Sequence, residues 1–153
     1  MKVENLMTHQ PMTCSQDDPL ALAAKKMWTE DCGILPVLDG DRLVGVITDR
    51  DIAMALGMRG ASANRVQVGD VTTGRIFSCS PKDEVAQALE VMREHRVRRL
   101  PVLDGDFLVG LISLNDIILE AGATAGKQKR PTYGMVVKAL RGICEHRNLP
   151  LAV

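Results

Sequence analysis

Apolar and polar positions follow a fixed order of patterns along the first third of the chain. A short apolar segment at Met12–Cys14 is followed by apolar residues at helical spacing, and then by two apolar runs, Ile34–Leu38 and Leu43–Ile47. The helical positions are Leu20, Ala23, Ala24 and Met27. Their spacing predicts an amphipathic helix, and Asp39-Gly40-Asp41 between the two runs predicts a β-hairpin, because glycine supplies the positive φ of a tight turn.

The same patterns return 65 residues later. Val3–Ala55 aligns with Val68–Glu120 without a gap, and 21 of these 53 positions are identical. The most similar part is Leu35–Thr48 against Leu100–Ser113. The second copy has its own strand segment, Phe77–Cys79, and the helical positions Val85, Ala88, Leu89 and Met92. The chain is therefore a duplication, and each copy is predicted to fold as β-α-β-β-α.

Residues typical of helix ends refine this prediction. Two pairs have capping-box spacing, with Asp in place of the usual Glu: Ser15 with Asp18, and Ser80 with Asp83. Pro81 suits the first position of a helix. The second helix of each copy is expected to run from Thr48 to near Gly57 and from Ser113 to near Gly122, where glycine suits the helix end.

These elements define an α+β (α/β) protein with four parts. Residues 1–57 are the first repeat, 58–65 a linker, 66–122 the second repeat, and 123–153 a basic tail with a predicted helix at Met135–His146. One repeat alone buries little apolar surface, so we expect the two to pack as a pseudo-two-fold pair, in which any cleft along the axis occurs twice.

The tail carries most of the charge asymmetry. Its six basic residues are Lys127, Lys129, Arg130, Lys138, Arg141 and Arg147, against one acidic residue, Glu145. A basic tail contacts nucleic acid or an acidic partner, or is simply a solvated face. Only Tyr133 provides an aromatic side chain among these cations, so nucleic acid is not the expected partner.

Composition also indicates the compartment of the protein and the kinds of site it contains. No apolar stretch approaches the roughly 20 residues that span a bilayer, and the N-terminus lacks the apolar core of a secretory signal, so a cytoplasmic protein is expected. The four cysteines form no Cys-x-x-Cys pair and the three histidines no ligand-spaced cluster, so no metal site is expected. Cys14 and Cys79 occupy equivalent positions and are interpreted as buried, reduced thiols. Trp28 is expected to pack at a dimer surface or to cap the core.

The repeated motif Leu-Pro-Val-Leu-Asp-Gly-Asp-x-Leu-Val-Gly-x-Ile-Thr/Ser-x-x-Asp resembles the CBS domain, named for cystathionine β-synthase. The lead-in Val3–Thr8 resembles the usual start of that domain, and the resemblance covers about residues 3–120. A tandem pair of this kind is a Bateman module. The resemblance implies a stand-alone regulatory module that binds AMP, ADP, ATP, NAD or S-adenosylmethionine between the repeats, and a disc-like homodimer.

Two motifs are candidates for ligand contact, one at the start of each second helix. Thr48 with Asp51 and Ser113 with Asp116 place a hydroxyl and a carboxylate at a helix N-terminus, which favours an anion. In the family, the hydroxyl contacts phosphate and the carboxylate accepts hydrogen bonds from both ribose hydroxyls. The same spacing is also that of a capping box that needs no ligand, and the Asp is able to alternate between the two roles.

The resemblance implies two clefts, each combining residues of both repeats. The first would use Ser113 and Asp116 with Thr13, Cys14, Gly33 and Ile34. The second would use Thr48 and Asp51 with Ser78, Cys79, Val97, Arg98 and Arg99. Guanidinium groups make charge-assisted, bidentate contacts with phosphate, so the second cleft is predicted to be the tighter phosphate site, unless the two arginines form only a solvated basic surface.

Three functions are therefore compared. The favoured one is a non-enzymatic sensor of an adenine nucleotide, AMP first and ATP or NAD as alternatives, that signals to an unknown protein partner. The alternative is a scaffold that binds no ligand and acts through its basic tail. An enzyme is the least favoured, because the sequence contains no nucleophile–base pair, metal cluster or phosphate loop.

Overall fold

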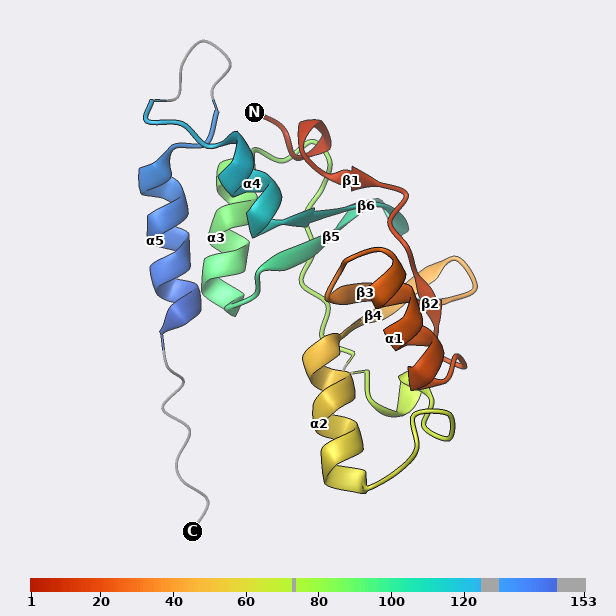
Figure 1. Ribbon diagram of the computed structural model, residues 1–153. Helices are drawn as coiled ribbons and strands as arrows, with labels where there is room; N and C mark the ends of the chain where they lie inside the picture. Colours follow the sequence, from red (N-terminus) through yellow and green to blue (C-terminus); the bar gives the residue numbers. More distant parts are fainter. Residues whose placement is uncertain (73, 125–129, 146–153) are drawn as a thin grey trace. The chain divides into compact units, whose positions relative to one another are not determined.

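Helices and short strands alternate through the computed structural model, which describes residues 1–72, 74–124 and 130–145 (Figure 1). The chain divides into two compact units. We call Thr8–Ile76 with Leu103–Gly110 the first-repeat unit, and Met1–Met7, Phe77–Val102 and Leu111–Val153 the second-repeat unit. The mixed α+β class predicted from the sequence is confirmed.

The first repeat follows the predicted order of elements. Its strand β2 (Cys14–Ser15) pairs parallel with β3 (Ile34–Asp39), which pairs antiparallel with β4 (Arg42–Thr48). Helix α1 (Leu20–Thr29) joins β2 to β3, and α2 (Asp49–Arg59) follows β4. Their apolar faces meet in one core, whose buried members are Cys14, Leu20, Ala23, Met27, Leu35, Val37, Ile47, Ile52, Val66 and Val68.

The second repeat has the same order. Helix α3 (Val85–His95) is followed by β5 (Arg99–Asp104), β6 (Phe107–Ser113) and α4 (Leu114–Glu120). The parallel pairing of Cys79 with Val102 repeats that of Cys14 with Val37, at positions 65 residues apart. Both hairpins turn at a glycine with positive φ, 59° at Gly40 and 60° at Gly105, as the Asp-Gly-Asp pattern predicts. The strand β1 (Thr8–His9) precedes β2 within the first repeat.

The compact units and the sequence repeats divide the chain differently. Each repeat begins with a 3-10 turn, Val3–Asn5 or Val68–Asp70, that belongs to the unit of the other repeat. The first amide of each turn donates a hydrogen bond, to the Asp83 carbonyl at 2.9 Å and to the Asp18 carbonyl at 2.9 Å. Backbone groups just before α3 and α1 are satisfied in this way by a segment remote in sequence.

The predicted start of the first helix in each repeat is wrong. Helices α1 and α3 begin five residues after Ser15 and Ser80. Those serines donate their amide hydrogens to Oδ2 of Asp18 at 3.1 Å and of Asp83 at 2.8 Å. The Ser–Asp pairs therefore close a turn ahead of the helix instead of capping it, and Pro81 is a buried residue of that turn rather than the first helical residue.

The second helix of each repeat begins where predicted. Thr48 and Ser113 are the N-cap residues of α2 and α4. The predicted end of α2 at Gly57 is wrong, because the helix continues to Arg59 and ends at Gly60, whose φ of 59° is left-handed. Helix α4 ends at Glu120, close to Gly122 as predicted.

Helices α1 and α3 both end through a left-handed residue that is not glycine. Asp31 has φ of 47° and Arg96, the equivalent residue, has φ of 55°. The amide of the following residue, Cys32 or Val97, then donates to a carbonyl of the last helical turn at 3.0 Å. This C-terminal turn directs the chain into β3 and β5, which begin with the candidate residues Ile34 and Arg99.

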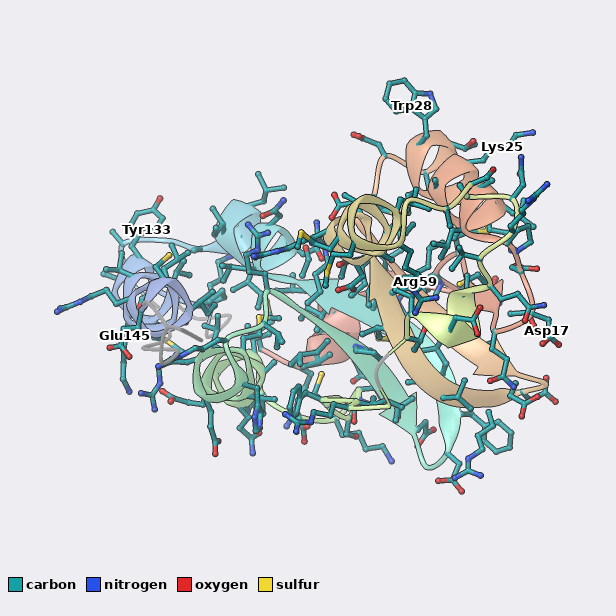
Figure 2. The ribbon with its side chains drawn as sticks, turned by 90° about the horizontal axis from the view of Figure 1, so that it is seen from below. Asp17, Lys25, Trp28, Arg59, Tyr133 and Glu145 are labelled. Carbon is teal, nitrogen blue, oxygen red and sulfur yellow. The ribbon has the colours of Figure 1, made fainter. Side chains whose placement is uncertain are left out.

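Two residues of α1, Ala24 and Trp28, lie at the surface of the first-repeat unit. Ala24 is exposed, although Leu20, Ala23 and Met27 are buried as predicted. Trp28 is 88% exposed, so it does not cap the core of its unit. It projects from α1 near Lys25 (Figure 2).

A helix beyond the repeats completes the second-repeat unit. Helix α5 (Tyr133–Cys144) begins two residues before the predicted Met135–His146, and its N-cap Thr132 accepts a hydrogen bond from the Met135 amide. It contacts α3 and buries Val136 and Ala139. His146, Lys127, Lys129 and Arg147 of the predicted tail lie outside the described residues. Within the described part of the chain, no helix is both long and apolar enough to cross a membrane.

Candidate functional site

The first candidate motif forms a complete capping box at the start of α2. The Thr48 amide and hydroxyl both donate to Asp51 Oδ2, at 2.9 and 2.6 Å, and the Asp51 amide donates to Thr48 Oγ at 3.2 Å. Both side chains are at the surface of the first-repeat unit. The carboxylate is therefore held in one orientation by its own helix.

The second motif repeats this geometry at the start of α4. The Ser113 amide and hydroxyl donate to Asp116 Oδ2 at 2.8 and 2.7 Å, and the Asp116 amide donates to Ser113 Oγ at 3.2 Å. In both motifs only Oδ2 takes part, so Oδ1 of each Asp has no hydrogen-bond donor among the residues the structure describes. Capping and ligand contact are therefore compatible, because they use different oxygens of one carboxylate.

The other candidates of the first repeat surround the same helix start. Ile34 lies opposite Thr48 in the β3–β4 pairing, and the Gly33 carbonyl accepts from the Asp49 amide at 3.3 Å. Thr13 precedes β2, and its carbonyl accepts a hydrogen bond from Lys26 Nζ at 3.0 Å. We call Thr13, Cys14, Gly33, Ile34, Thr48 and Asp51 the first half-site, because all of them belong to the first-repeat unit.

The equivalent residues of the second repeat form the second half-site, within the second-repeat unit. Its members are Ser78, Cys79, Val97, Arg98, Arg99, Ser113 and Asp116. The Arg98 carbonyl accepts from the Leu114 amide at 2.8 Å, as Gly33 does from Asp49. Arg98 is exposed and Arg99 half-buried, and neither forms an ion pair with any residue that the structure describes.

The resemblance to the CBS family implies clefts that combine residues of one repeat with residues of the other. Each half-site, by contrast, is described within a single unit. Thr48 and Asp51 belong to one unit, and their predicted partners Arg98 and Arg99 belong to the other. The grouping of Thr13, Cys14, Gly33 and Ile34 with Ser113 and Asp116 crosses the units in the same way. Both combined clefts therefore stay predictions.

Asp49, which lies beside the first half-site, was not among the residues predicted from the sequence. A Cβ built on Gly33 would lie 2.9 Å from Oδ2 of Asp49, so this carboxylate adjoins the backbone of the first half-site. The equivalent residue of the second half-site is Leu114, which is 3% exposed. Aligning the repeats already shows Asp against Leu at this position, and that difference was the available signal.

The two cysteines of the half-sites are buried thiols. Burial raises the pKa of Cys14 to about 11 and that of Cys79 to about 12. Both are free, and Cys14 lies 3.8 Å from the Pro36 carbonyl oxygen. A thiol with so high a pKa stays protonated at neutral pH, so these residues supply shape and packing rather than a nucleophile or a metal ligand.

Comparison with known families identifies the repeat. The CBS domain family matches residues 3–57 and again residues 68–122. The chain belongs to the CBS domain family and contains two such domains in tandem. Pairs of CBS domains are regulatory ligand-binding modules.

Individual relatives agree with this assignment. The CBS domain-containing protein YhcV of Bacillus subtilis is 33% identical over 115 residues, which cover 75% of this chain and 81% of YhcV. A putative signal-transduction protein with CBS domains from Burkholderia ambifaria has 30% identity and a TM-score of 0.72, covering 84% of this chain and 97% of that structure.

A third similar structure contains ligands. The CBS domain pair of protein MJ0100, in complex with 5'-methylthioadenosine and S-adenosyl-L-methionine, has 25% identity and a TM-score of 0.71. The match covers 78% of this chain and 94% of that structure. Some CBS pairs of this fold thus bind ligands that contain adenosine.

Proposed function

We propose that this protein is a sensor of an adenine nucleotide, with AMP as the first expected ligand and ATP, NAD or S-adenosylmethionine as alternatives. Thr48 and Asp51 hold one ligand together with residues of the second half-site, and Ser113 and Asp116 hold the other together with residues of the first. The protein acts by binding and by changing its affinity for a partner, and not by catalysis.

The observation that carries this proposal is the divided use of the Asp51 carboxylate. Its Oδ2 is occupied by the Thr48 amide and hydroxyl, at 2.9 and 2.6 Å. Its Oδ1 stays available to a ligand hydroxyl, in an orientation that the helix start already fixes. A carboxylate positioned before the ligand arrives loses little conformational entropy on binding, which favours recognition of a ribose diol.

The phosphate end of the ligand is assigned to Arg98 and Arg99. Neither guanidinium is neutralised by a carboxylate of the described residues, so both are available to an anion. The first half-site has Gly33 and Ile34 at these positions and the Asp49 carboxylate beside them, which disfavours phosphate. The ligand of Thr48 and Asp51 is therefore expected to be the more tightly bound phosphate ester.

Regulation follows from a ligand that contacts both repeats. Such a ligand stabilises whichever arrangement of the repeats offers both sets of contacts, and so shifts the population toward it. The link to a protein partner is expected to be worth about 1–3 kcal/mol, as for other allosteric couplings.

The test is calorimetric titration of the full chain with AMP, ATP, NAD and S-adenosylmethionine, using Asp51→Ala and Asp116→Ala as a matched pair. Both variants lose the same capping box, so their folding penalties are comparable. Losing charged hydrogen bonds to the ribose costs about 1.5–3 kcal/mol. Asp51→Ala should therefore weaken binding of AMP at the tighter site by about ten- to a hundredfold, while Asp116→Ala leaves that affinity within about threefold.

Two results would contradict the proposal. Equal losses from both variants would remove the predicted asymmetry between the sites. If no adenine compound raises the melting temperature, the sensor function itself is wrong, because a ligand at about 100 times its dissociation constant stabilises a protein by about 2.7 kcal/mol.

A further inference from the structure

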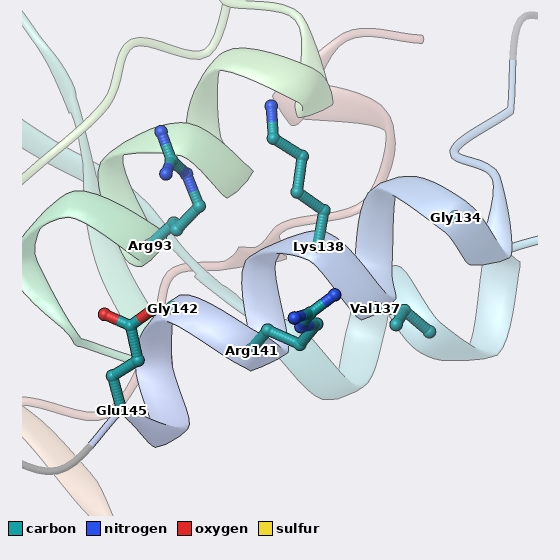
Figure 3. A pocket seen from close by; sticks show the side chains of 7 residues that line it. All are labelled: Arg93, Gly134, Val137, Lys138, Arg141, Gly142 and Glu145. Atoms are coloured by element: carbon teal, nitrogen blue, oxygen red, sulfur yellow. The ribbon is translucent and has the colours of Figure 1, made fainter.

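A groove away from both half-sites lies between α3 of the second repeat and α5, which follows that repeat (Figure 3). Its volume is about 320 Å³, and it lies entirely within the second-repeat unit. Helix α5 follows the last residue matched by the CBS family, residue 122, so the groove is an addition to the common fold. None of the residues that line it belongs to either half-site.

The groove carries an excess of positive charge. Arg93 from α3 and Lys138 and Arg141 from α5 line it, against the single carboxylate of Glu145. Glu90, one turn before Arg93, accepts from Arg93 at 2.6 Å and from Lys138 at 2.8 Å. The Glu90 carboxylate thus forms ion pairs with both cations. Hydrogen bonds from Lys138 and Arg93 hold the pKa of Glu90 below its usual value.

Arg141 is the cation that the groove does not neutralise. It is exposed and forms no ion pair with a residue of the described ranges. Figure 3 shows the Lys138 and Arg141 side chains leaving α5 in different directions, with the Arg93 side chain of α3 extending in much the same direction as Lys138. The charges are spread along the helices instead of converging on one point, an arrangement that suits an extended polyanion better than a single phosphate group.

A glycine sets the close approach of the two helices at this place. A Cβ built on Gly142 would overlap Cγ of Arg93 and come within 3.6 Å of the Arg93 carbonyl oxygen. The aliphatic part of Arg93 therefore crosses α5 directly over Gly142. Any larger residue at 142 would displace the Arg93 side chain.

Apolar surface borders the cations. Val137, which lines the groove, is 54% exposed, and Tyr133, one turn earlier on α5, is 57% exposed. Exposed apolar and aromatic side chains beside Arg are typical of surfaces that bind proteins, where they supply the buried contact and the charges supply specificity. A nucleic-acid backbone has no apolar side chain to cover Val137, whereas a protein segment does.

We propose that the α3–α5 groove binds an acidic segment of a partner protein, in which carboxylates alternate with apolar side chains. The carboxylates contact Arg141 and compete with Glu90 for Arg93 and Lys138, while an apolar side chain covers Val137. The residues of this groove belong to neither half-site, and the groove provides the chain with a docking site for the protein it regulates.

The experiment measures the anisotropy of a dye-labelled peptide of repeated Asp-Glu-Leu units, titrated with the full chain at low ionic strength. Arg141→Glu should weaken binding by about tenfold or more, because it replaces an attraction with a repulsion. Lys25→Glu makes the same charge change at an exposed residue of α1, in the other unit, and should leave affinity within about twofold. Gly142→Ala, which changes no charge, should also weaken binding by displacing Arg93.

Each comparison has a result that overturns the proposal. Equal losses from Arg141→Glu and Lys25→Glu would mean general charge attraction, and equal affinity for an Asn-Gln-Leu peptide would mean that carboxylates are not recognised. Tighter binding of oligothymidylate of the same formal charge would assign the groove to nucleic acid. Melting curves of the variants confirm that they are folded, and AMP titration of Arg141→Glu should match that of the unchanged protein, which separates this proposal from the sensor function.

Discussion

The two repeats keep the same backbone and hydrogen-bonding geometry while their charges differ. Each begins its second helix with a hydroxyl–carboxylate box in which the amide–carboxylate distance is 2.9 Å at Thr48 and 2.8 Å at Ser113. Before that helix, the first repeat has Gly33 beside the Asp49 carboxylate, and the second has Arg98 beside the apolar Leu114. The two half-sites therefore present the same hydrogen-bonding groups with opposite local charge.

This difference shows how a duplicated fold can acquire two unequal sites. The box is built from groups that the helix start needs for its own amide hydrogens, so both copies retain it. Residues 33, 49, 98 and 114 take no part in the box. Their charges differ between the repeats, and the affinity for an anionic ligand is expected to differ with them.

The largest expected effect comes from removing the arginines of the second half-site. Arg98→Ala with Arg99→Ala should weaken AMP binding at the tighter site by about ten- to a hundredfold, because charge-assisted hydrogen bonds to phosphate are lost. Binding of adenosine, which has no phosphate, should change by less than about threefold. Calorimetric titration with both compounds gives the two values.

The control is Arg65→Ala with Arg75→Ala, two exposed arginines of the first-repeat unit. This variant has the same net charge as the test variant and should bind AMP normally. An equal loss in both variants would show that only the overall charge matters and that the repeats do not differ at the site.

A second difference between the repeats concerns stability. Lys26 Nζ donates to Asp18 Oδ2 at 3.0 Å and to the Thr13 carbonyl at 3.0 Å, and the equivalent residue of the second repeat is Val91. Lys26→Met keeps the aliphatic part and removes both bonds, so the free energy of unfolding at neutral pH should fall by about 1–2 kcal/mol. Lys25→Met, at the exposed neighbouring position, should leave it nearly unchanged, as chemical denaturation can measure.

The same variant should alter the response to acid. Burial raises the pKa of Asp18, but the Lys26 ammonium and the Ser15 amide outweigh it and hold the pKa below 3.8. A carboxyl whose pKa is lower in the folded protein than in the unfolded chain stabilises the fold at pH values above the unfolded pKa. This stabilisation is lost as the pH falls from the unfolded pKa through the folded one. Between about pH 5 and pH 3, Lys26→Met should therefore lose less stability than the unchanged protein. A parallel loss in both proteins would contradict this role of the ion pair.

The smallest expected effect concerns Asp49. Asp49→Asn removes the negative charge beside Gly33 and retains a carbonyl oxygen for the Arg50 amide, which now donates to Asp49 Oδ1 at 2.7 Å. In an Asp51→Ala background, which isolates the weaker site, AMP affinity should rise by about two- to threefold, as expected for one partly screened charge. Asp41→Asn, at the exposed hairpin turn, is the control and should have no effect.

Much of the fold could be predicted from local patterns. The hairpins, the N-caps at Thr48 and Ser113, and the buried faces of α1 and α3 depend on residues close together in sequence. The capping box was also visible in the sequence, but the choice between cap and ligand contact was not. That choice depended on which carboxylate oxygen the helix uses, and only coordinates distinguish Oδ1 from Oδ2.

Other features depended on partners remote in sequence. The helix starts predicted at Ser15 and Ser80 were wrong because the backbone just before each helix pairs with the 3-10 turn at the start of the other repeat. The left-handed ends of α1 and α3 carry Asp31 and Arg96 instead of glycine, so no local signal marked them.

The duplication, the order of elements and the hydroxyl–carboxylate motifs were thus determined by the sequence alone, because periodicity and turn chemistry act over a few residues. Tertiary structure decided which repeat each lead-in turn completes, that Asp49 adjoins Gly33, and that α5 forms a basic groove with α3. These features require contacts between groups far apart in the chain, and such contacts depend on the packing of the whole unit rather than on any one segment.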